Sequence, residues 1–166
     1  MVNKVRVYGK AQNRTALGIV HAYMVMNPGA TLADLRKAFP NDLCPDRGVP
    51  ENFMTVQDAA SYNERMSLYF AKPEETLRTG DGQEVALSQI WSKTSFDRIV
   101  AHAAQYGIEI AQFDKTKIGE KGGFRLEYLN GYIPPTGKKK GIAWWIWLLA
   151  VIVIAAIAAT VYFATK

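Results

Sequence analysis

An apolar stretch near the C-terminus constrains this chain more than any other feature. From Ile142 to Ala164 there are 23 residues and no charged side chain. A helix of that length spans about 34 Å, whereas the hydrocarbon core of a bilayer is about 30 Å thick. Soluble core helices rarely run this long without a charge. We therefore predict a transmembrane helix over residues 142–164, a Pro/Gly/Lys linker over 131–141 and a folded domain over 1–130.

Basic and aromatic side chains flank the apolar stretch on both sides. Tryptophan and tyrosine are enriched at the headgroup level of membranes, and lysines beside a span favour the cytoplasmic side. We therefore expect the preceding domain to be cytoplasmic. The residues expected at the membrane interface are Lys138, Lys139, Lys140, Trp144, Trp145, Trp147, Tyr162 and Lys166.

The arrangement of domain, linker and span resembles the topology of tail-anchored membrane proteins. The opening residues, MVNKVRVYGK, contain no apolar h-region, so we expect no signal peptide. Ala155 and Ala159 form a small-xxx-small pair, which would allow two spans to pack closely. The resemblance concerns topology and implies no activity. The expected partners are the lipid bilayer, another protein and a second copy of the span.

The charge distribution gives little support to nucleic-acid binding by the domain. The whole chain carries 20 basic and 15 acidic residues. Four of the basic residues, Lys138–Lys140 and Lys166, flank the apolar stretch, which leaves 16 basic and 15 acidic residues, a net charge of +1. A nucleic-acid-binding domain normally shows a clear basic excess. We therefore favour a protein partner over a nucleic acid.

Within residues 1–130, helical and strand periodicities alternate, which predicts an α+β domain. We expect about three helices and four to five mainly antiparallel strands. Residues 40–52 have no period and several prolines, which predicts a loop. Residues 52–65 could form a strand followed by a helical turn, but their pattern does not decide the secondary structure. The predicted helices run over about 15–26, 32–39 and between Thr94 and Gly107, and the predicted strands over 4–8, 66–70, 84–91, 108–113 and 124–129.

Several short signals mark where these elements should begin, turn or end. Side-chain caps precede helices, and an Asp-Gly pair between strands indicates a hairpin. The expected signals are a cap at Asn13, capping boxes at Thr31/Asp34 and Thr94/Asp97, a hairpin turn at Asp81–Gly82 and a helix end at Gly107.

Residues 15–40 form two predicted helices joined by a Gly-containing turn, and this stretch resembles the opening of a helix-turn-helix or winged-helix domain. The resemblance implies that the second helix contacts DNA, through Arg36 and Lys37. Asp34 opposes those two cations, and a recognition helix normally carries more polar contacts. The alternatives are an αα-hairpin packed on a sheet, which we favour, and a helix-turn-helix-like surface that binds protein.

Candidate catalytic residues are few and scattered. His21 falls at the edge of the apolar face of the first helix, and His102 is expected to be exposed on the third. Cys44 has no neighbouring histidine in the sequence, so we expect a buried or incidental thiol. The carboxylates show no metal-ligand spacing, and no cofactor is indicated. The candidate carboxylates in expected loops are Asp46, Glu74, Glu75, Asp81 and Glu84.

Three functional hypotheses remain after these observations. The favoured one is a non-enzymatic, single-pass membrane protein whose cytosolic domain binds another macromolecule at the membrane surface. The second is a membrane-tethered helix-turn-helix regulator that binds DNA. The third is a membrane-bound, nuclease-like enzyme.

Overall fold

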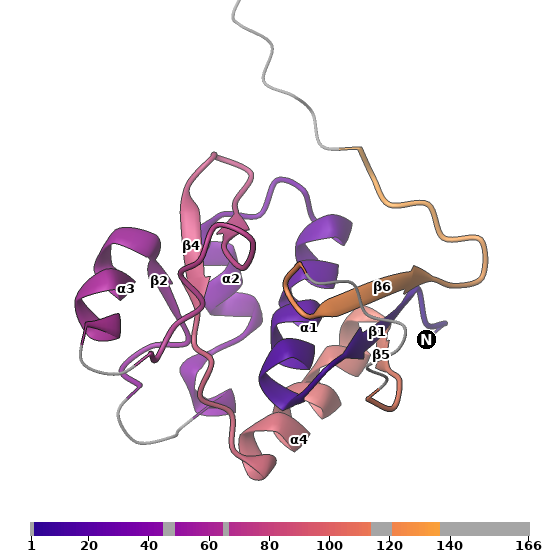
Figure 1. Ribbon diagram of the computed structural model, residues 1–166. Helices are drawn as coiled ribbons and strands as arrows, with labels where there is room; N and C mark the ends of the chain where they lie inside the picture. The colour runs from indigo at the N-terminus through magenta and orange to yellow at the C-terminus, as the bar shows by residue number, and fades with distance from the viewer. Residues whose placement is uncertain (1, 45–48, 65–66, 114–120, 137–166) are drawn as a thin grey trace, which may run out of the picture.

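Two three-stranded sheets and four α-helices make up the part of the chain that the computed structural model describes, which is residues 2–44, 49–64, 67–113 and 121–136 (Figure 1). The helices are α1 (Gln12–Met26), α2 (Leu32–Ala38), α3 (Val56–Asn63) and α4 (Lys93–Ala103), with 3-10 turns η1 (Asn41–Leu43) and η2 (Ala104–Tyr106). The strands are β1 (Val5–Gly9), β2 (Phe53–Thr55), β3 (Leu77–Arg78), β4 (Glu84–Leu87), β5 (Ile108–Ile110) and β6 (Phe124–Tyr128).

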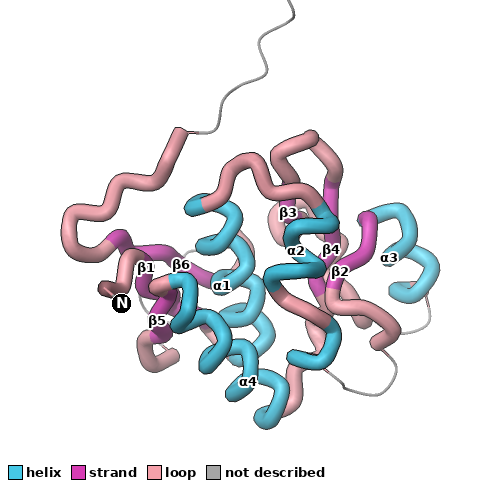
Figure 2. Tube along the Cα trace, turned by 180° about the vertical axis from the view of Figure 1, so that it is seen from behind, coloured by secondary structure: helices cyan, strands magenta, loops and turns pink. Residues whose placement is uncertain are grey.

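The first sheet has the strand order β5-β1-β6 and joins the two ends of the domain. β1 pairs in parallel with β5 and antiparallel with β6. Val5 and Val7 alternate with Arg6 along β1, so the valines face the core and the arginine faces outward. Figure 2 shows α1 and α4 lying over one face of this sheet.

The second sheet has the order β2-β4-β3 and is antiparallel throughout. The turn between β3 and β4 contains Gly82, whose φ is +91°, a conformation that suits glycine. Phe53, Val85 and Leu87 face the main core, whereas Met54 and Ala86 face a smaller apolar cluster beneath α3. The second sheet is therefore covered on both faces.

Helix α1 lies at the centre of the molecule, and His21 is its only exposed residue. Seven of its 15 residues are buried. Gly18 allows α1 to lie directly on β1, since a Cβ atom there would stand 2.6 Å from Cγ1 of Val7. The main core runs without interruption from the first sheet through α1 to β2 and β4. The two sheets therefore belong to one domain.

The α+β class is confirmed, but the expected numbers are not. The described residues hold four helices rather than about three, and six strands rather than four or five. One strand pair, β1 with β5, is parallel. Residues 56–63, which the sequence left undecided, form α3. Residues 67–70 contribute one isolated bridge between Tyr69 and Ser88, where a strand over 66–70 was expected.

Some of the expected end signals are confirmed. Thr31 and Asp34 form the predicted capping box, the Asp81–Gly82 hairpin joins β3 to β4, and Gly107 ends η2 with φ +73°. The other two caps are wrong. Helix α1 begins after Ala11 with no side-chain cap, and Ser92 rather than Thr94 caps α4, because its hydroxyl accepts from the Ser95 amide.

The predicted membrane span lies outside the described residues, together with all eight residues expected at its interfaces. No helix in the described part of the chain is long and apolar enough to cross a bilayer. The described domain continues beyond β6 to Thr136, and Tyr132 packs against the core.

Candidate functional site

A groove lies beside α1 in the described surface. It consists of three adjoining hollows of about 560, 330 and 230 Å³. The first and second share Asn27 and Ala30, and the second and third share His21, Thr76 and Leu77. We call the three hollows together the α1 groove.

The first hollow lies between α1, α2 and η2. Tyr23 and Tyr106 form its aromatic wall, with ring centroids 4.9 Å apart. Burial raises the pKa of both phenols, and the nearby Asp34 carboxylate raises that of Tyr23 further. Asp34 and Lys37 stand at the rim, so the hollow joins an aromatic wall to charges of both signs. This combination is typical of a surface that binds a polypeptide.

The second and third hollows lie between α1 and the segment of residues 74–80. His21 separates them, and its ring lies 5.2 Å from that of Phe124. Desolvation by the surrounding side chains lowers the pKa of His21. The residue is nevertheless exposed at the surface. Arg78 and Lys121 add positive charge to the rim, and Glu74 adds negative charge.

An ion pair closes the groove at the N-terminal end of α1. Nη1 of Arg14 lies 2.6 Å from Oε1 of Glu75, a carboxylate that is 9% exposed. The same guanidinium lies over the ring of Phe70 and donates to the carbonyl of Gly122. Through this contact Glu75 joins the start of α1 to the segment before β3.

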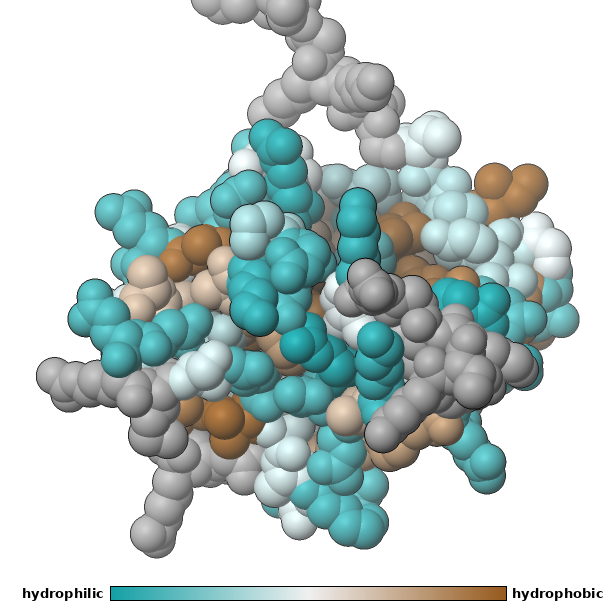
Figure 3. All heavy atoms as spheres, in the orientation of Figure 1, coloured by the Kyte–Doolittle hydropathy of each residue, from teal (hydrophilic) through white to brown (hydrophobic). Residues whose placement is uncertain are grey.

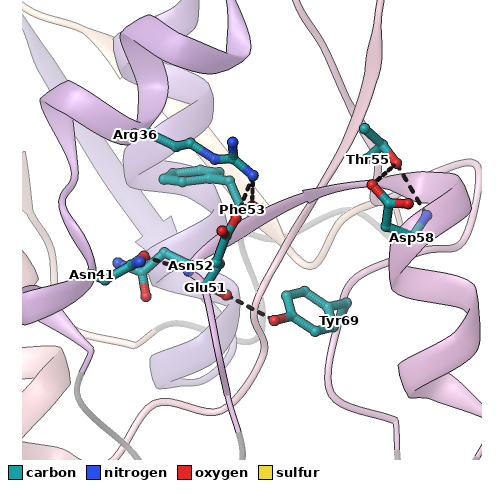
Figure 4. A network of polar contacts seen from close by, with 8 residues as sticks. All are labelled: Arg36, Asn41, Glu51, Asn52, Phe53, Thr55, Asp58 and Tyr69. Atoms are coloured by element: carbon teal, nitrogen blue, oxygen red, sulfur yellow. Dashed lines mark hydrogen bonds and ion pairs between the residues drawn. The ribbon is translucent and has the colours of Figure 1, made fainter.

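The structure brings Arg36 and Lys37 to different surroundings, although both lie on α2. Arg36 forms an ion pair with Glu51 and donates to the carbonyl oxygen of Phe53 at 3.2 Å. Figure 4 shows its guanidinium directed toward these two residues. Lys37 instead lines the first hollow of the α1 groove. One of the two cations expected to contact DNA is therefore already engaged within the domain.

His102 is half-buried and not exposed, which corrects the expectation from the helical wheel. Its Nε2 atom lies 2.6 Å from the carbonyl oxygen of Ala38, and the Tyr106 hydroxyl donates to the same oxygen at 3.0 Å. The wheel placed His102 away from the main apolar face of α4 but took no account of α2, whose end packs there. His102 and Tyr106 thus hold the C-terminal end of α2.

The remaining candidates do not converge on a reactive centre. Cys44 is buried, as expected, and its Sγ lies 3.0 Å from the carbonyl oxygen of Ile90. Asp46 lies outside the described residues. Glu74 and Glu75 line the groove, Asp81 bonds to Thr79 in the hairpin, and Glu84 lies on β4. Among the residues described, no three His, Cys, Asp or Glu side chains form a group that could hold a metal ion.

Sequence reasoning missed most of the α1 groove. Its walls come from segments far apart in the chain, namely residues 17–38, 74–80, 106 and 121–124. The available signal was Tyr23 at the end of an apolar helix beside the turn at residues 27–30. No protein family, curated protein or solved structure matches the chain.

Proposed function

We propose that this chain is a single-pass membrane-anchored protein whose cytosolic domain binds a segment of another protein in the α1 groove. The anchor is the apolar stretch of residues 142–164, which has the length and the flanking lysines of a membrane span. The domain supplies the binding activity, and no enzymatic step is assigned to it.

The observation that carries the binding role is that the three hollows of the α1 groove adjoin one another through shared lining residues. Its hollows follow α1 from Leu17 to Asn27, a rise of about 15 Å. An extended segment of about five residues has that length. Tyrosines that line a hollow beside a charged rim resemble the anchoring pockets of protein interfaces, where a few aromatic contacts supply most of the affinity.

A substitution at Gly29 tests the groove directly. Gly29 lines the first hollow, its φ is not in the left-handed region, and a Cβ atom there meets nothing within 4 Å. Gly29→Gln should therefore fill the hollow without disturbing the fold. Ala101→Gln is the matched control, since Ala101 is exposed on α4 and lines none of the three hollows.

The experiment is affinity capture from detergent extracts with the full chain and added nuclease. We expect a defined protein partner to be retained by the native chain and by Ala101→Gln, and to be lost by Gly29→Gln. Equal capture of the partner by all three chains would show that the partner does not bind in the α1 groove. Loss of every partner on adding nuclease would favour the DNA-binding hypothesis instead.

The two alternatives have less support. Helix α2, the counterpart of a recognition helix, has only seven residues, and its Arg36 is paired with Glu51. DNA binding predicts an affinity of the full chain that falls steeply with added salt. For an enzyme, His21 would have to act with a partner, but no hydrogen bond joins it to another side chain in the described ranges. The nuclease-like hypothesis therefore has no assigned residues.

A further inference from the structure

Three exposed apolar side chains lie on the N-terminal segment, at the end of β6 and on the segment that follows β6. Val2, Tyr128 and Ile133 are 70, 45 and 84% exposed. They account for three of the five large apolar residues that the described surface exposes; the other two are Tyr62 and Phe113. We call Val2, Tyr128 and Ile133 the terminal patch. In Figure 3, apolar surface appears at the right edge, where the segment after β6 runs.

Hydrogen bonds and a ring contact hold the two chain segments of the terminal patch together. Nδ2 of Asn130 donates to the carbonyl oxygen of Asn3 at 2.8 Å. The ammonium of Lys4 lies 5.6 Å from the ring centroid of Tyr132, whose ring in turn lies 6.4 Å from that of Tyr128. Figure 1 shows the N-terminus beside the end of β6. The patch is therefore a defined corner of the domain.

The length of the connecting chain limits which surface can approach a bilayer. Thr136 is the last residue described, and the apolar stretch begins at Ile142. Six residue steps span at most about 20 Å when fully extended. A domain of this size is about 35 Å across. The connection is shorter than the domain is wide, so the surface around Thr136, which includes Ile133, lies nearest to the point of insertion.

We infer that the terminal patch rests on the headgroup layer of the membrane that the apolar stretch crosses. This inference depends on the proposed anchor. Tyrosine and isoleucine suit the boundary between headgroups and acyl chains. Lys4 at the patch and Lys138–Lys140 in the linker would attract anionic lipid, at roughly 1 kcal/mol for each lysine near the surface.

Two acidic residues, Glu109 and Glu127, lie next to the patch, and the guanidinium of Arg6 pairs with both, so it compensates one of their two charges. Glu109 forms hydrogen bonds with Arg6 and Asn3. The carboxylate of Glu127 accepts from the Tyr8 hydroxyl at 2.6 Å. Three apolar side chains alone would bind a membrane weakly, so the anchor supplies the affinity and the patch sets the orientation. Helix α3, at the far end of the molecule in Figures 1 and 2, then points away from the bilayer.

Site-specific fluorescence in vesicles tests this orientation. Tyr128→Cys, Ile133→Cys and the control Ala60→Cys each place a reactive thiol on an exposed position, with Ala60 on α3. The native Cys44 is buried, and the unsubstituted chain measures any labelling of it. The full-length chains are labelled, reconstituted into vesicles of phosphatidylcholine and phosphatidylglycerol, and quenched by nitroxides attached to lipid headgroups.

We expect quenching at positions 128 and 133 to be several-fold stronger than at position 60. Adding Ile133→Asp to the chain labelled at position 128 should reduce its quenching toward that of position 60. Weak, equal quenching at all three positions, in a chain that resists extraction by alkaline carbonate, would overturn the inference and leave the anchor intact. Extraction of the chain by carbonate would overturn the anchor, and the inference with it.

Discussion

The guanidinium of Arg14 and the carboxylate of Glu75 join two parts of the domain that are 61 positions apart in the chain. Arg14 lies in the first turn of α1, and Glu75 belongs to the loop before β3. Cζ of Arg14 also lies 4.6 Å from the ring centroid of Phe70. Because Glu75 is nearly buried, its charge depends on this one arginine for compensation within the described contacts.

Removing the arginine should leave an uncompensated carboxylate in the interior. We expect Arg14→Met to lower the free energy of unfolding by about 2–3 kcal/mol, below the range for fully buried pairs because Arg14 is partly exposed. The double variant Arg14→Met/Glu75→Leu should lose less than the two single variants together. Urea unfolding followed by circular dichroism measures both. Additive losses would show that the pair is not coupled.

Two glycines that face each other should respond oppositely to the same substitution. A Cβ atom at Gly80 would lie 2.6 Å from the backbone of Gly29, whereas one at Gly29 meets nothing within 4 Å. We expect Gly29→Ala to raise the free energy of unfolding by about 0.4–1 kcal/mol, because it restricts the unfolded chain. Gly80→Ala should lower it by about 1–3 kcal/mol through overpacking. Thermal unfolding of the two variants is the check, and a loss at Gly29 would contradict the expectation.

The two donors on the Ala38 carbonyl should each stabilise the end of α2. Tyr106→Phe removes one hydrogen bond and keeps the ring contacts, so we expect a loss of about 1 kcal/mol. His102→Ala should cost more, because it also removes a ring 5.8 Å from that of Phe39. Amide hydrogen exchange at residues 35–39 is the direct measurement. Unchanged protection in both variants would mean that α2 does not need these donors.

Alkaline pH should destabilise the domain through Tyr69. The Tyr69 hydroxyl donates to the carbonyl of Glu51 at 2.8 Å, and burial raises the pKa of this phenol to about 12. The folded state therefore favours the neutral phenol. Its contribution to stability is complete below the unfolded pKa of about 10 and is lost as the pH rises toward 12.

The tyrosinate absorbance of the native chain and of Tyr69→Phe, titrated side by side, isolates this group. The difference between the two curves should lie above that of free tyrosine. A difference curve centred near pH 10 would show that the hydroxyl is open to solvent.

Local patterns predicted the elements whose side chains face one core. Phe96 and Ile99 have helical spacing, and this pattern predicted α4. The Asp81–Gly82 pair predicted the hairpin between β3 and β4. The sequence did not decide the secondary structure of α3. Only Ala59 of its eight residues is buried, so the segment has almost no periodic pattern of apolar residues. At the start of α4, the predicted cap at Thr94 was wrong, because the hydroxyl of Ser92, two residues earlier, accepts from the Ser95 amide.

Local sequence patterns did not predict the contacts between segments that are far apart in the chain. The parallel pairing of Val5 with Ile108 depends on the path of the chain over α1 and α4, which no short motif encodes. The α1 groove has the same origin, because Tyr106 reaches Tyr23 only after α4 has crossed the sheet. Of the expected contact residues, Lys37 lines this groove, and Arg36 turns instead toward β2.

The position of Arg36 has a consequence for the behaviour of the protein at high concentration. β2 is an outer strand of its sheet, and the carbonyl of Phe53 would otherwise offer an open acceptor to a strand of another molecule. The guanidinium of Arg36 occupies that acceptor, so the carbonyl is not open to an added strand. The side chain expected to contact DNA therefore closes one backbone acceptor at the free edge of β2.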